Sequence, residues 1–172
     1  MRHRATRSAI AAAIAAIGLL GCGEGGKTAA TPLEPTRETS CALDGMVLLD
    51  YPGPKAQIHY DQGGPDFFCD TLEMFVIYLR PEQKRRVTGI FTQDMGKADW
   101  KEPRGHWIDA RSAFYVAGSR LAGSMGPTMA SFARQEDAEA FVRRHGGKVY
   151  RFAEVTYEMV RLDGGVLRDE RM

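Results

Sequence analysis

The sequence predicts an α+β fold of two related ββα(β) units that follow an N-terminal leader and a flexible tether. Apolar residues alternate in short segments typical of strands and recur at helical spacing in two longer segments. Turns rich in Gly and Pro separate strand from helix twice in the same order. The domain is expected over 41–167, with units at about 41–100 and 101–167 and a tail at 168–172.

The first unit is expected to contain a strand over Ala56–Tyr60 and a helix over Asp66–Arg80. Asp61–Pro65 is dense in turn residues, which favours a tight connection between the two. In the helical segment apolar side chains recur three or four residues apart, and Pro81 ends the pattern. This interpretation places Cys69 inside an apolar helix, where a Cys is commonly a small hydrophobe.

The second unit repeats the order and adds a closing strand. Strands are expected over Phe114–Ala117 and Met129–Phe132, and a helix over Gln135–His145. Acids near the helix start and bases near its end complement the helix dipole, and Gly146-Gly147 ends the helix. Lys148–Phe152 then alternates as a strand does.

The first residues predict export and lipidation. Three Arg precede an uncharged run over Ser8–Gly21 that is too short to span a membrane, which is typical of a secretory signal. Its end, Leu19-Leu20-Gly21-Cys22, resembles the lipobox of bacterial lipoproteins. We therefore expect a signal peptide over 1–21, a lipid on Cys22, and a periplasmic protein anchored to a membrane.

The start of the mature chain indicates where the anchor lies and how the fold is attached. In such lipoproteins Asp after the lipidated Cys is linked to inner-membrane retention; Gly23 stands there and favours the outer membrane. Residues 22–40 are rich in Gly, Thr, Pro and Glu, so a flexible tether is expected. Without 1–21 the chain has 20 basic and 22 acidic residues, a net charge of about −2 that offers no nucleic-acid footprint.

The candidate metal ligands are sulfur atoms. Cys41 and Met46, with Gly45 permitting a sharp turn between them, can converge on one soft ion, and thiolate with thioether selects copper(I). Met125 lies in a loop punctuated by Gly and Pro, where a side chain has less core to fill. Met129 is expected to point inward as core, which is the ordinary role of Met.

Other interpretations of these residues stay open. Cys41 and Cys69 are the thiols that remain besides Cys22, and in an oxidising compartment they can form a disulfide. His59 and His106 could add an imidazole ligand, although each pattern is more typical of a surface or half-buried histidine.

The sequence offers no support for an enzyme. It contains no His-Glu-x-x-His, no Gly-x-Ser-x-Gly, no phosphate-binding Gly loop and no pair of closely spaced Cys motifs. Asp66, Asp70 and Glu73 gather near one helix start, where acids complement the helix dipole and need no catalytic role.

Five segments resemble the NosL family, lipoprotein accessory factors encoded with nitrous-oxide reductase. They occur in order and span nearly all of the chain beyond the tether: Cys41–Met46, Asp50–Gln57, Met125–Thr128, Asp137–Phe141 and His145–Val149. The resemblance implies a fold of two related ββα-type units, similar to a domain of organomercurial lyase.

The resemblance also implies a function. A NosL-like protein is expected to be a copper(I) chaperone that delivers copper for the copper–sulfide centre of nitrous-oxide reductase in denitrification, with that reductase and its maturation machinery as partners. By position, Cys41 and Met46 match the family's ligand motif and Met125 is a third candidate. Asp44 stands where many relatives have a second Cys, and a carboxylate is a poor match for copper(I).

Two rival functions remain. One is a metal-free docking lipoprotein with a Cys41–Cys69 disulfide, whose surface recognises the reductase or its maturation machinery. The other is a redox or mercury-related enzyme, which only the analogy of fold suggests. The sequence does not fix the oligomeric state.

Overall fold

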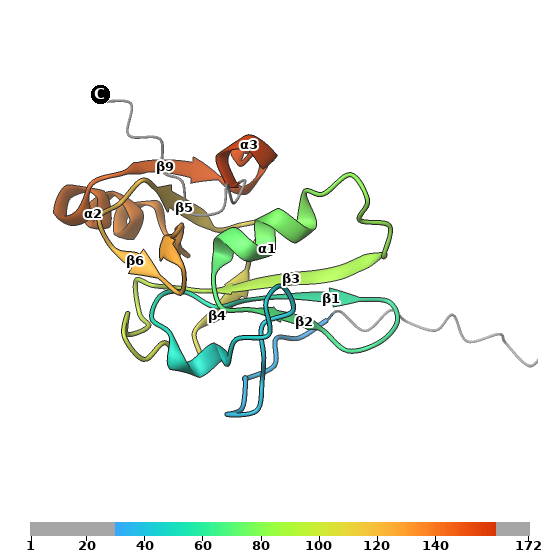
Figure 1. Cartoon of the computed structure of the whole chain (residues 1–172). Helices are drawn as coiled ribbons and strands as arrows, with labels where there is room; N and C mark the ends of the chain where they lie inside the picture. Colours follow the sequence, from blue (N-terminus) through green and yellow to red (C-terminus); the bar gives the residue numbers. More distant parts are fainter. Residues whose placement is uncertain (1–29, 161–172) are drawn as a thin grey trace, which may run out of the picture.

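The computed structural model describes residues 30–160, so the expected signal peptide, Cys22 and the tail at 168–172 lie outside the described residues. Two antiparallel sheets and two main helices form the fold (Figure 1). Within 30–160, no helix has the length and apolar character needed to cross a bilayer.

The first unit is a hairpin, a helix and a returning strand. Its elements are β1 (Ala56–Tyr60), β2 (Asp66–Phe68), α1 (Thr71–Tyr78) and β3 (Val87–Gln93). β4 (Trp107–Asp109) pairs with β3, so the sheet has the order β2-β1-β3-β4 and extends beyond residue 100.

The second unit has the same connectivity. Its elements are β5 (Phe114–Ala117), β8 (Ala130–Phe132), α2 (Gln135–His145) and β9 (Lys148–Arg151), with the sheet order β8-β5-β9. In the first unit β1 therefore lies between β2 and β3, the strand after the helix. In the second unit β5 lies in the same way between β8 and β9. The expected α+β fold of two related ββα(β) units is confirmed, and the first unit is also closed by a strand.

Short elements complete the chain. A small hairpin, β6 (Ala122–Gly123) and β7 (Gly126–Pro127), lies between β5 and β8. The remaining pieces are single turns: η1 (Leu48–Asp50), η2 (Phe152–Glu154) and α3 (Tyr157–Val160).

The helix expected over Asp66–Arg80 is wrong at both ends. Its first three residues form β2, and α1 begins only at Thr71, because the Asp70 side chain caps the helix by accepting a hydrogen bond from the Leu72 N–H at 2.9 Å. Cys69 therefore lies at the junction of β2 and α1, not inside a helix.

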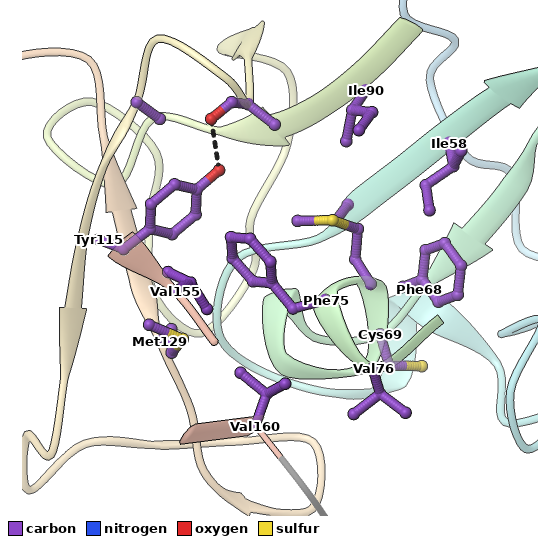
Figure 2. Close-up of a cluster of buried hydrophobic side chains, with 14 of the residues drawn as sticks. Ile58, Phe68, Cys69, Phe75, Val76, Ile90, Tyr115, Met129, Val155 and Val160 are labelled. Carbon is purple, nitrogen blue, oxygen red and sulfur yellow. Dashed lines mark hydrogen bonds between the residues drawn. The ribbon is translucent and has the colours of Figure 1, made fainter. Parts of the chain in front are cut away.

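The core joins the two units across α1. Figure 2 shows Phe75 of α1 beside Tyr115 of β5, and their ring centroids are 4.9 Å apart at 74°, a favourable edge-to-face contact. The Tyr115 hydroxyl donates to the Ala110 carbonyl at 2.8 Å, so this buried polar group is satisfied. α1 is consequently covered by its own sheet and by the second unit.

The segment expected to be a free tether contacts the fold in its second half. The Leu33 backbone makes two hydrogen bonds of 2.9 Å with the Gln57 side-chain amide, and Glu34 accepts from the Trp107 indole N–H at 2.7 Å. The expectation of a flexible tether over 22–40 is therefore wrong from Leu33 onward, because the chain is bonded there to β1 and β4.

Gly147 is expected to be indispensable for the turn between α2 and β9. Its φ is +96°, and an added Cβ would lie 2.5 Å from the Ala117 carbonyl oxygen. We expect Gly147→Ala to lower the free energy of unfolding by about 1–2 kcal/mol for the left-handed backbone and by about 1–3 kcal/mol more for the steric overlap. Chemical denaturation measures the sum of these two losses in the free energy of unfolding.

Gly105→Ala is the matched control, because Gly105 also has a positive φ, +56°, but an added Cβ would meet nothing within 4 Å. It should show the backbone cost alone. Equal losses in the two variants would contradict the steric contact.

Candidate metal centre

The loop from Cys41 to Met46 is closed by its own backbone. The Cys41 N–H donates to the Met46 carbonyl at 2.8 Å, and the Gly45 N–H donates to the Cys41 carbonyl at 2.9 Å. Gly45 has a φ of +79°, which a residue with a side chain rarely adopts. The loop thus holds the backbones of Cys41 and Met46 opposite each other.

The Cys41 thiol lies in a buried cluster with Cys69 and Glu73. One ligand atom from each of the three residues lies within 4.8 Å of the other two. Cys41 Sγ is 2.9 Å from Glu73 Oε2 and accepts a weak hydrogen bond from the Leu43 N–H at 3.4 Å. Both thiols are free, so the structure does not contain the Cys41–Cys69 disulfide that was the alternative expectation.

Glu73 is held in the cluster by the start of α1. Asp70 is the N-cap, and Glu73, three residues later, folds back to accept the N–H of Cys69, the residue before the cap, at 3.1 Å. Its second oxygen accepts the Ser124 hydroxyl at 3.3 Å. One carboxyl group therefore connects the Cys41 loop, the β2–α1 junction and the β6–β7 hairpin.

Lys55 places a positive charge beside the cluster of Cys41, Cys69 and Glu73. Its side chain is fully buried, and its ammonium donates to the carbonyls of Tyr51, Pro52 and Cys69 at 2.8, 3.1 and 3.0 Å. Burial lowers the pKa of Lys55, while the neighbouring Cys69, Asp70, Glu73 and Cys41 oppose that shift. Three carbonyl acceptors satisfy the ammonium without a direct ion pair.

Hydrogen bonding in the cluster shifts the pKa values of the two thiols in opposite directions. Hydrogen bonding with the Cys69 side chain lowers the pKa of Cys41 to about 6, against the opposing effect of burial. The same hydrogen bond, with burial, raises the pKa of Cys69. Burial, followed by the hydrogen bond with Cys41, raises the pKa of Glu73 to about 8. The shifts favour Cys41 over Cys69 as the thiol that ionises first.

The hairpin that carries Met125 is fastened to the start of α1. Besides the Ser124–Glu73 contact, the Thr128 hydroxyl donates to the buried Asp70 carboxylate at 2.5 Å. Met125 occupies the β6–β7 turn with 53% of its surface exposed. The structure thus brings the Met125 turn to the cluster through Ser124, and leaves the thioether open to solvent.

The other candidate residues lie elsewhere. Met46 is half-buried against the main core, and Met129 is buried, as expected. His59 hydrogen-bonds Gln57 at 2.7 Å and packs on Phe91, whereas His106 is exposed. In the described part of the chain, neither histidine belongs to the Cys41–Cys69–Glu73 cluster.

Sequence reasoning missed Lys55 and Glu73 as members of this centre, and it weighed Cys69 as a disulfide partner or a core residue. For Glu73 a signal was available, because Asp70-Thr71-Leu72-Glu73 has the spacing of a capping box. For Lys55 there was none, since a lone Lys before a strand is ordinarily exposed. The two thiols of this cluster suit a soft, reduced metal ion better than a hard cation.

The chain is similar in sequence to one known protein family. The family model described as NosL matches residues 32–160. The copper-binding lipoprotein NosL of Stutzerimonas stutzeri is 39% identical over 163 residues, which cover 92% of this chain and 85% of that protein. The protein of the same name from Achromobacter cycloclastes is 38% identical over 165 residues, covering 93% and 84%.

A solved structure is also similar. The crystal structure of the copper chaperone NosL from Shewanella denitrificans matches with a TM-score of 0.72 and 36% identity, over 74% of this chain and 97% of that one. The similarity in fold therefore accompanies similarity in sequence.

The ionisation of Cys41 gives a direct test of the cluster. We expect the ultraviolet absorbance of a thiolate to rise with a midpoint near pH 6 in the metal-free protein, and this step to be absent in Cys41→Ser. In Cys69→Ala the hydrogen-bond donor is lost, so the midpoint should move upward, whereas Cys69→Ser retains a donor and should move less. A midpoint that is the same in Cys69→Ala as in the parent would contradict the thiol–thiol hydrogen bond.

Proposed function

This chain belongs to the NosL family, and on that basis we propose that it is a periplasmic copper(I) chaperone for the assembly of nitrous-oxide reductase. The observation that carries the proposal is the buried Cys41 thiol in a loop closed against Met46, with the exposed Met125 turn fastened to the same cluster. The relatives are named as copper-binding and chaperone proteins, which supports binding and transfer rather than catalysis.

Copper(I) is the cargo, and Cys41, Met46 and Met125 are the proposed ligands. The pKa of Cys41, near 6, provides a thiolate at neutral pH without a strong base nearby. Thioethers favour copper in its reduced state and discriminate against calcium, magnesium and manganese, which prefer oxygen. The site's chemistry therefore selects the ion as well as its oxidation state.

Release of copper(I) requires that a partner protein can reach the site from solvent. Cys41 is buried, but Met125 is half-exposed at a hairpin turn. A partner's ligand can replace the Met125 thioether first and reach the ion from that side, so transfer proceeds by stepwise exchange. The copper–sulfide centre of nitrous-oxide reductase is the proposed destination.

The proposed location follows from the leader. A lipid on Cys22 anchors the chain at the periplasmic face of a membrane, and Gly23 at the next position favours the outer membrane. The curated relatives are named lipoproteins, which supports the anchor.

The ligand set is tested by titrating the lipoprotein, reduced and in detergent, with copper(I) against a chromophoric chelator. We expect one ion per chain, a loss of affinity of at least about 100-fold in Cys41→Ser, and losses of about 10-fold in Met46→Leu and Met125→Leu. Leu preserves the volume of Met, so these variants remove the sulfur with little effect on packing.

Met159→Leu is the matched control, since Met159 is also exposed but lies on α3. It should bind copper as the parent does. If the parent fails to compete and contains no free thiol, the protein is instead the metal-free docking lipoprotein with a Cys41–Cys69 disulfide.

Delivery is tested with copper-free nitrous-oxide reductase. The copper-loaded protein should restore copper and activity faster than a chelator that buffers copper(I) at the same free concentration, because transfer by ligand exchange does not wait for free ions. Cys41→Ser, supplied with equal copper, should match the chelator. Equal rates for the parent and the chelator would contradict a direct transfer.

A further inference from the structure

The thiol of Cys69 belongs to the cluster but is not among the proposed copper ligands. We propose that Cys69 is a second thiolate ligand, so that copper(I) is held between Cys41 and Cys69 in the interior while Met125 is the ligand exchanged at the surface. This inference rests on the proposed function and adds a ligand to the same site.

The distance between the sulfur atoms fits a single ion. Cys41 Sγ and Cys69 Sγ lie within 4.8 Å of each other. A thiolate sulfur binds a metal ion such as zinc at about 2.3 Å, so two sulfurs on opposite sides of one ion are about 4.6 Å apart. Both thiols are therefore close enough together to contact the same ion.

The backbones that carry the two thiols are bonded to each other. The Ala42 N–H, next to Cys41, donates to the Phe67 carbonyl at 2.7 Å, two residues before Cys69. Cys69 is fixed further by its N–H to Glu73 and by its carbonyl to Lys55. The relative position of the thiols is thus set by the fold before any metal binds, as a ligand pair requires.

Charge favours two thiolates at this point. A monovalent ion between two thiolates carries a net negative charge, which is costly in a buried site without a compensating cation. The Lys55 ammonium is buried beside Cys69 and bonded to its carbonyl. It supplies the missing positive charge while its hydrogen bonds go to the carbonyls of Tyr51, Pro52 and Cys69.

Glu73 is not the second ligand in this arrangement. A carboxylate is a hard donor and a poor match for copper(I). Its oxygens are already engaged by the Cys69 N–H and the Ser124 hydroxyl, so it positions Cys69 and the Met125 turn.

Cys69→Ser separates a ligand from a structural thiol, because the hydroxyl keeps the size and the donor but does not bind copper(I) well. We expect the lipoprotein carrying Cys69→Ser to lose copper(I) affinity by more than about 100-fold, beyond the 10–100-fold typical of residues that only support a ligand. X-ray absorption at the copper edge should show one short copper–sulfur contact fewer than in the parent. Ala130→Ser places a hydroxyl in a separate buried cluster, away from the two thiols, and should leave both readouts unchanged; that cluster consists of Val116, Ala130, Phe132, Ala138 and Phe141.

The outcomes distinguish this inference from the function beneath it. If the parent binds copper(I) tightly through Cys41 and Cys69→Ser binds it equally well, Cys69 is a core residue and only the inference fails. If circular dichroism shows that Cys69→Ser is folded, yet its affinity falls less than about 100-fold with an unchanged count of sulfur contacts, the inference also fails. If the parent does not bind copper(I), the proposed function itself fails.

Discussion

The Lys55 ammonium is the constraint around which the candidate metal centre is built. A lysine with no exposed surface must have acceptors on every side, and here the carbonyls of Tyr51, Pro52 and Cys69 provide them. Those acceptors come from segments before β1 and before α1, so satisfying one charge fixes the loop that follows η1 against the junction that carries Cys69. The charge in turn favours anionic neighbours, which explains how acids and thiols are tolerated in the interior. The hydrogen bonds that hold these two segments together around Lys55 therefore also hold the candidate site together.

Most of the fold could be predicted from periodicity, and the exceptions have physical causes. The strands Ala56–Tyr60 and Phe114–Ala117 and the helix Gln135–His145 occur where the pattern places them. The helix expected from Asp66 begins late, because a short apolar run does not distinguish strand from helix and the cap at Asp70 decides the boundary. β3 (Val87–Gln93) was missed because it is buried in the middle of its sheet, where no simple alternation of polar and apolar residues is required.

The candidate site was less accessible to sequence reasoning. Cys41 and Met46 are neighbours in the chain, so a motif can reveal them; Cys69 and Glu73 join them only through tertiary contacts, at a separation of about 30 residues. The acid at position 73 looked like an ordinary partner of a helix dipole, and it does occupy a capping position. The Cys41 loop and the second unit pack over the start of α1 and make this capping residue a member of the candidate metal centre.

The bonding of Leu33 to Gln57 limits how far the domain can travel from its anchor. Between a lipid on Cys22 and the first bonded residue there are eleven residue steps, which span at most about 40 Å when fully extended. A domain tied this closely samples a thin layer of the periplasm rather than its depth. On the proposed function, an enzyme that receives copper from this domain has to come to the membrane, and the proposed lipid sets the place where donor and acceptor meet.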